Sequence, residues 1–128
     1  MKLLLDTHLL IWATVATRQL SMRATDMIAD PDNDLFFSAV AIWEIAIKQG
    51  LKRPDFVPDA RRLRRTLLDN DYSELELTSD HALALERLPP IHKDPFDRIL
   101  VAQAIHEDIM LLTSDTLLAQ YPGPIMLV

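Results

Sequence analysis

Short apolar runs that alternate with helical patterns constrain the fold of this chain more than any other feature. The first run, Lys2–Leu5, is almost continuously apolar, as expected for a strand buried on both faces. Further strands are expected at Leu35–Phe37, Leu75–Leu77, Met110–Thr113 and Ile125–Val128. Because strands and helices alternate, the pattern predicts an α/β fold with a mainly parallel central sheet of about five strands and helices on both faces.

Helical segments are expected between these strands, and the residues at their ends support the assignment. We expect helices from about His8, from Ser21 to about Ala29, from Ser38 to Gly50, from Asp59 to about Leu68, from Thr78 or Ser79 to Leu88, from Asp94 to about Glu107 and over Thr116–Gln120. Serine, threonine and aspartate are common N-caps. Gly50 stands where a helix-ending glycine is typical, and Pro95 suits the first turn of a helix.

Length and composition favour one ordinary globular domain over residues 1–128. Of the 128 residues, 49% are hydrophobic and 25% are charged, which argues against disorder. No apolar run reaches the roughly 18 residues of a membrane helix, and Asp6 interrupts the leucine-rich N-terminus that resembles a signal peptide. Cysteine is absent, so any metal must be held by oxygen or imidazole, and a cytoplasmic location is expected.

Acidic residues stand at the positions that an α/β fold uses for binding sites. Asp6 follows the first strand, and Asp115 follows the fourth strand by two residues. Ligands of parallel sheets bind beyond the carboxyl ends of the strands, where the strand order reverses. Glu44 lies inside an otherwise apolar helix, and Asp97 precedes the apolar run Ile99–Ala102. Such acids would repel one another if they converged, and a divalent cation would relieve that repulsion.

Each of these acids also has a purely structural explanation. Asp6 and Asp115 could each cap a following helix, and Asp97 could be favoured by the dipole of the helix that it begins. Glu44 could pair with Lys48 at the i,i+4 spacing of a helix. Spacing alone therefore leaves a metal site and a set of helix caps both open.

Four segments, taken together, resemble the successive motifs of a known family. They are LLLDTHLLIW, SAVAIWEIAIKQGLK, LPPIHKDPFDRILVAQA and LLTSD, and they occur in the family's order from Lys2 to the last strand. The chain resembles the PIN-domain family, and in particular the VapC-type ribonuclease toxins of prokaryotic toxin–antitoxin pairs. The resemblance implies a single PIN domain over residues 1–128, with a three-layer fold.

The resemblance also implies which residues form the site. Matched motif by motif, the catalytic and metal-binding acids are Asp6, Glu44, Asp97 and Asp115. Asp6 and Asp97 are expected to be the primary metal ligands, with Glu44 and Asp115 completing the shell directly or through water. Thr113 is a plausible hydroxyl contact to water or phosphate.

Four further residues fit the toxin-like subgroup. His8 and Asp94 are expected to act in the second shell of the site or in the structure around it, together with Trp12 and Pro95. The implied cofactor is Mg²⁺ or Mn²⁺, as one or two ions, and the implied reaction is RNA hydrolysis that leaves a 5′-phosphate and a 3′-hydroxyl. The implied partners are an RNA substrate, a second copy of the chain in a homodimer, and a small VapB-like antitoxin that occupies the active-site groove.

The net charge of −6 argues mildly against nucleic-acid binding, but a local basic cluster offsets it. Seven of the thirteen basic residues are Lys48, Lys52, Arg53, Arg61, Arg62, Arg64 and Arg65. Phosphate backbones respond to local positive charge, so this cluster favours an RNA-facing or partner-facing rim over a merely solvated helix face. Trp12, Trp43 and the pair Phe36-Phe37 are expected to be core or dimer contacts rather than base-stacking platforms.

Two other classes of protein remain as alternatives. One is a different metal-dependent phosphoesterase or phosphatase, but the aspartyl-nucleophile kind usually has a second Asp where this chain has His8. A response-regulator receiver domain needs an Asp after its third strand, and the expected third strand here ends at Leu77-Thr78. The other is a non-catalytic PIN-like module that binds RNA or protein. Loss of a site acid would mark such a module, and all four acids are present, which favours the active enzyme.

Overall fold

The central sheet contains five strands in the order β3-β2-β1-β4-β5, and every pairing is parallel. The computed structural model describes residues 1–51 and 59–128. The strands are β1 (Lys2–Leu5), β2 (Asp34–Ser38), β3 (Ser73–Leu75), β4 (Met110–Thr113) and β5 (Ile125–Leu127). The α/β fold with a parallel sheet is therefore confirmed.

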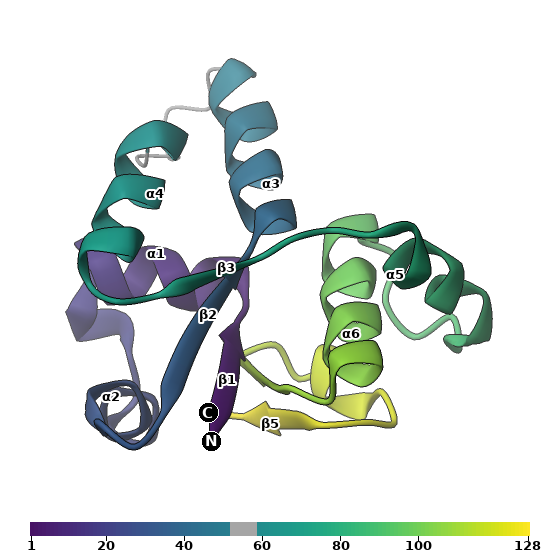
Figure 1. Cartoon of the computed structure of the whole chain (residues 1–128). Coiled ribbons are helices and arrows are strands. Elements are labelled where there is room, and N and C mark those ends of the chain that lie inside the picture. Colours follow the sequence, from purple (N-terminus) through teal and green to yellow (C-terminus); the bar gives the residue numbers. More distant parts are fainter. Residues whose placement is uncertain (52–58) are drawn as a thin grey trace.

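Helices cover both faces of this sheet (Figure 1). The α-helices are α1 (Thr7–Val15), α2 (Met22–Ala29), α3 (Ala39–Gly50), α4 (Ala60–Asp69), α5 (Ser79–Ala84) and α6 (Pro95–Glu107). Short 3₁₀ helices are η1 (Thr17–Gln19), η2 (Leu85–Arg87) and η3 (Leu118–Gln120). Among the described residues, no helix is both long and apolar enough to cross a membrane.

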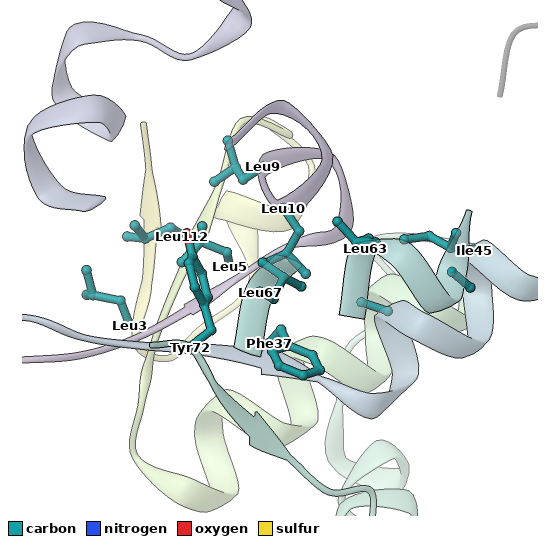
Figure 2. Packing of buried hydrophobic residues seen from close by; sticks show 12 residues of the cluster. Leu3, Leu5, Leu9, Leu10, Phe37, Ile45, Leu63, Leu67, Tyr72 and Leu112 are labelled. Atoms are coloured by element: carbon teal, nitrogen blue, oxygen red, sulfur yellow. The ribbon is translucent and has the colours of Figure 1, made fainter. Parts of the chain in front are cut away.

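Strand β1 shows why the sheet has two buried faces. Its side chains alternate: Leu3 and Leu5 enter one core and Leu4 enters the other, as the period of two of a strand requires. The first core packs β1 against α1, α3 and α4, and Figure 2 shows Leu63 and Leu67 of α4 among its members. The second core packs the opposite face against α6 and η3. A continuous apolar run is thus the expected pattern for this central strand.

Strand order reverses around β1, which fixes the place of the site. The chain passes from β1 to β2 and β3 on one side, and then returns to β4 on the other side of β1. Leu4 pairs with Phe36 of β2 and with Leu111 of β4, so the carboxyl ends of all three strands lie at one edge. Residues that follow β1 and β4 meet at this edge.

Three of the predicted elements differ in their bounds. The α-helix predicted to Leu88 ends at Ala84, and residues 85–87 form the 3₁₀ helix η2. Strand β3 lies at Ser73–Leu75 rather than 75–77, because Leu75 pairs with Ser38 and the chain then turns into the capping box of α5 at Thr78 and His81. The helix predicted over residues 116–120 is a single 3₁₀ turn.

The helix ends follow the predicted caps, with one difference. The side chains of Ser21, Ser38 and Asp59 each accept a backbone hydrogen bond at the start of α2, α3 and α4. Gly50 is the last residue of α3, as predicted, but its φ is not positive. The glycine is therefore not required there by a left-handed conformation.

Candidate metal centre

Asp6 lies where β1 turns into α1, and its carboxylate is buried, with 3% of the residue exposed. Its Oδ1 accepts a hydrogen bond from the backbone N of Leu9 at 2.9 Å, so it caps α1. Its Oδ2 accepts a hydrogen bond from Thr113 Oγ1 at 2.6 Å. Burial raises the pKa of Asp6, and these two donors lower it only in part. The cap that the sequence offered as an alternative is therefore real, yet it leaves a buried carboxylate that is costly to ionise.

Thr113 joins the ends of β1 and β4. It is the last residue of β4 and is fully buried. Its hydroxyl donates to Asp6 and accepts a hydrogen bond from the backbone N of Asp115 at 3.0 Å. One hydroxyl thus positions an acid from each strand end.

Glu44 reaches the same region from α3, with 3% of the residue exposed. Its Oε1 accepts a hydrogen bond from Thr7 Oγ1 at 2.7 Å, and its Oε2 accepts one from Lys48 Nζ at 2.6 Å. The i,i+4 pair with Lys48 is thus present. A carboxylate in an apolar helix needs such partners, and the helix holds it beside the start of α1.

Asp97 lies in the first turn of α6, after the N-cap Asp94 and Pro95. The pKa of Asp97 is raised to about 7: burial is the largest cause, the negative charges of Asp94, Glu44 and Asp6 add to the rise, and His92 opposes it. Glu44, on α3, and Asp6, the N-cap of α1, therefore both act on the charge of Asp97 in the first turn of α6.

Asp115 and His92 complete the cluster. His92 Nε2 lies 3.0 Å from Asp115 Oδ2 and 3.4 Å from Asp97 Oδ2. Each of these three residues offers a ligand atom within 4.8 Å of the other two. Burial acts to raise the pKa of Asp115, but hydrogen bonds from His92 and from the backbone N–H groups of Leu117 and Leu118 outweigh it, and the pKa is lowered.

These residues suit a hard divalent cation. The four acids offer carboxylate oxygens as ligand atoms, and Mg²⁺ and Mn²⁺ prefer such ligands. The raised pKa values of Asp6 and Asp97 reflect buried negative charge that a cation would offset. Of the four predicted acids, Asp97 and Asp115 belong to the compact group with His92, whereas Asp6 and Glu44 lie outside that group and act on Asp97 through their charge.

A second group of possible ligands, His81, His106 and Glu107, lies between α5 and α6. His81 is buried, and its Nδ1 accepts a hydrogen bond from the backbone N of Thr78 at 3.0 Å. Its Nε2 lies 2.8 Å from Glu107 Oε2. Because a backbone N–H can only donate, the proton of a neutral His81 ring is on Nε2 and points to Glu107. The contacts of His81 therefore cap α5 and join it to α6.

Other residues named from the sequence lie around the centre or away from it. His8 is exposed, its ring lies 5.9 Å from that of Trp12, and its charge lowers the pKa of Asp6. The side chain of Asp94 accepts a hydrogen bond from the backbone N of Phe96 at 2.8 Å, so Asp94 caps α6. Both residues thus border the acids, and neither offers an atom to the three-residue ligand group described above.

The basic residues divide into three sets. Lys48 contacts Glu44 and therefore belongs to the centre itself. Arg61, Arg62, Arg64 and Arg65 are all exposed, and all but Arg62 line a groove of about 970 Å³ between α3 and α4. Lys52 and Arg53 lie outside the described residues.

The aromatic residues are not all in the core. Phe37 is fully buried and Phe36 is partly buried, whereas Trp43 is 54% exposed. The Trp43 ring packs edge-on against Phe96, with a distance of 5.0 Å between ring centroids. Trp43 thus lies outside the core, and a dimer contact at Trp43 stays a prediction.

Sequence reasoning missed His92. The residue stands two positions before the helix cap Asp94, in a proline-rich loop without a regular pattern. Its long-range hydrogen bonds are with Asp115 and Tyr121, which lie 23 and 29 residues away along the chain. Only the folded structure brings these together, so neither spacing nor periodicity could have indicated them.

Comparison with known proteins assigns the chain to a family. A chain in the crystal structure of VapBC2 from Rickettsia felis, bound to a DNA fragment from their promoter, superposes with a TM-score of 0.72 over 98% of each chain, at 13% sequence identity. At this identity the likeness shows the fold alone. A search of curated protein sequences finds no match. The family model described as PIN domain matches residues 3–124, and the chain therefore belongs to the PIN domain family.

Proposed function

We propose that this protein is a metal-dependent endoribonuclease and the toxin of a toxin–antitoxin pair. The observation that carries the proposal is the convergence of Asp6, Glu44, Asp97 and Asp115 at the carboxyl ends of β1 and β4. Membership of the PIN domain family supports it, as does the intact set of four acids.

In this proposal the four acids hold Mg²⁺ or Mn²⁺. Asp6 and Asp97 are the primary ligands, and Glu44 and Asp115 complete the shell directly or through water. A bound divalent ion supplies Lewis-acid stabilisation of phosphate charge and lowers the pKa of a bound water. The chain's own residues position these groups, because Thr113 fixes Asp6 and the backbone of Asp115, and Lys48 fixes Glu44.

RNA is the proposed substrate, and α4 is the proposed contact surface for its backbone. Arg61 and Arg65 stand on the exposed side of α4, next to α3, which carries Glu44. The α3 residues that line this groove lie on another side of α3 than Glu44, so the arginines would act through their positive field, which draws the phosphate backbone toward this part of the molecule.

A VapB-like antitoxin and a second copy of this chain are the proposed protein partners. Support comes from the fold shared with a chain of the VapBC2 structure from Rickettsia felis, whose name denotes a complex. The motif resemblance described above points to the same class of toxin. An antitoxin would act most directly by covering the acids at the edge of the sheet.

The test is cleavage of end-labelled, structured RNAs by the purified protein in Mn²⁺ or Mg²⁺ and in EDTA. We expect metal-dependent cuts that disappear in EDTA and in Asp97→Asn, which keeps the shape of the side chain but removes its charge. Asp26→Asn changes an exposed acid elsewhere and should cut like the wild type. Substantial cleavage by Asp97→Asn, or the absence of any cut by folded, metal-loaded wild type, would contradict the proposal and favour a binding module.

A further inference from the structure

We infer that His92 is a positioning residue of the metal centre: it donates a hydrogen bond from Nε2 to Asp115 beside Asp97, and it does not itself bind the metal. This inference rests on the proposed function, because it concerns the shell around the same ion. It assigns a role to a histidine that lies within ligand distance of two carboxylates and would otherwise be counted as a ligand.

The hydrogen bond at the other ring nitrogen carries the argument. His92 Nδ1 accepts a hydrogen bond from the backbone N of Asp94 at 3.1 Å. A backbone N–H can only donate, so Nδ1 must present its lone pair and carries no proton. In a neutral imidazole the proton is then on Nε2.

That proton faces the two carboxylates. His92 Nε2 lies 3.0 Å from Asp115 Oδ2, within the range of a hydrogen bond, and 3.4 Å from Asp97 Oδ2, beyond the usual range. A nitrogen that carries a proton has no lone pair for a metal. Metal-binding histidines show the reverse pattern, in which the second ring nitrogen donates to a carbonyl or carboxylate. Here the second nitrogen is an acceptor.

The ring is held in this orientation from outside the acid cluster. The backbone N of His92 donates to Tyr121 Oη at 2.8 Å, and Tyr121 is buried, with 4% exposed. The side chain of His92 is itself only 16% exposed. The loop before α6 is therefore tied both to the cap of α6 and to the end of η3, which leaves the imidazole little freedom to turn.

Asp115 is fixed by the combined contacts. Its Oδ1 accepts a hydrogen bond from the backbone N of Leu117 at 2.8 Å, and its Oδ2 faces His92. Oδ1 also accepts a hydrogen bond from the backbone N of Leu118 at 3.4 Å, so Oδ2 is the oxygen that keeps a lone pair free for a ligand. Loss of the His92 contact would let Asp115 turn toward solvent, since its side chain is 36% exposed. Loss of such an outer contact lowers metal affinity by about 10- to 100-fold in well-studied sites.

The experiment compares Mn²⁺ affinity, by calorimetry, for the wild type, His92→Phe, His92→Gln and the control His106→Gln. His92→Phe keeps a ring but has no donor, and we expect about 10- to 100-fold weaker binding. His92→Gln can place an N–H donor near the position of Nε2 and should bind within a few-fold of the wild type. His106 lies near a different carboxylate, that of Glu107, so His106→Gln should bind like the wild type.

A second measurement uses the wild type alone and does not depend on how the variants fold. Two-bond ¹H–¹⁵N correlation spectra at pH 8 identify the ring nitrogen that carries the proton. We expect the Nε2–H form of His92 both without metal and with Mg²⁺. The inference is overturned if His92→Phe binds Mn²⁺ like the wild type, or if Nε2 is unprotonated in the Mg²⁺ form. A wild type that binds no Mn²⁺ would instead overturn the proposed function, and this inference with it.

Discussion

At the scale of single residues, the centre is built from carboxylates whose charge the protein alone compensates only in part. Thr113 and the backbone N of Leu9 donate hydrogen bonds to Asp6, and Lys48 and Thr7 donate hydrogen bonds to Glu44. The charged form of Asp97 remains costly, as its pKa of about 7 shows. Such a site lowers the free energy of unfolding of the metal-free protein at neutral pH, and unfolding experiments can measure the decrease.

The metal-free protein should lose stability as pH rises from about 4 to about 7. The pKa of Asp97 is about 7 in the folded protein and near 3.8 in the unfolded chain, so the folded state binds more protons in this window. The free energy of unfolding then falls with rising pH, by at most about 4 kcal/mol for a pKa difference of about three. Asp6 contributes in the same direction.

Urea unfolding of wild type and Asp97→Asn in EDTA at pH 5 and pH 8 measures this effect. The variant should be the more stable protein at pH 8, with a shallower dependence on pH. Equal slopes for the two proteins would contradict the burial and charge environment described for Asp97. Asp26→Asn, on the exposed side of α2, is the matched control and should keep the wild-type slope.

Replacement of the Thr113 hydroxyl tests the link between the two strand ends. Thr113→Val keeps the shape but leaves buried Asp6 with one donor fewer and the backbone N of Asp115 without its acceptor. We expect a loss of about 1–3 kcal/mol in the free energy of unfolding, measured with urea. Thr113→Ser retains the hydroxyl and should recover most of the difference. A valine variant as stable as wild type would show that the hydroxyl is not needed.

At the scale of elements, local chemistry predicted most of the fold. The strands at 2–5 and 110–113 match the expected bounds because continuous apolar runs are typical of central parallel strands. The helices from Ser21, Ser38, Asp59 and Asp94 begin at their caps. Edge strand β3 was misplaced by two residues, because its register is set by pairing with β2 and not by its own pattern.

A pair of glycine substitutions separates a required glycine from a tolerant one. Gly123 has φ +139°, and a Cβ there would lie 2.8 Å from Ile105 Cγ1 on α6. Gly123→Ala should therefore cost about 1–3 kcal/mol. At Gly50, at the end of α3, no atom of the described residues lies within 4 Å of such a Cβ, so Gly50→Ala should be neutral or stabilise by up to about 1 kcal/mol. Thermal unfolding of both variants tests this, and an equal loss in both would contradict the assignment.

At the scale of the whole molecule, the site depends on topology that spacing alone does not fix. Residues 6 and 115 could be expected at one edge once a parallel sheet was predicted, because both follow strands. Glu44 and Asp97 could be assigned only through the family resemblance, since each also had a local explanation. Neither position after a strand nor the family resemblance predicted the contact between His92 and Asp115, because this contact depends on the course of an irregular loop.

The basic rim on α4 also belongs to this scale, because it acts through the charge of a whole surface. Reversal of Arg61 and Arg65 to glutamate should lower kcat/KM for RNA at low salt and weaken its dependence on salt, since fewer counterions are displaced from the phosphates. Reversal of Arg18 and Arg87, which lie on η1 and η2, changes the net charge equally and is the control. Equal effects of the two double variants would argue against a specific rim.

Anomalous diffraction from crystals soaked in Mn²⁺ tests the central claim most directly, because it locates the ion. We expect a manganese peak among the carboxylates of Asp6, Glu44, Asp97 and Asp115, with His92 Nε2 not bonded to the ion. Crystals of Asp97→Asn should show a weaker peak or none. A peak only at His81, His106 and Glu107, or no peak in crystals that hold the acids free of lattice contacts, would contradict a metal centre at the edge of this sheet.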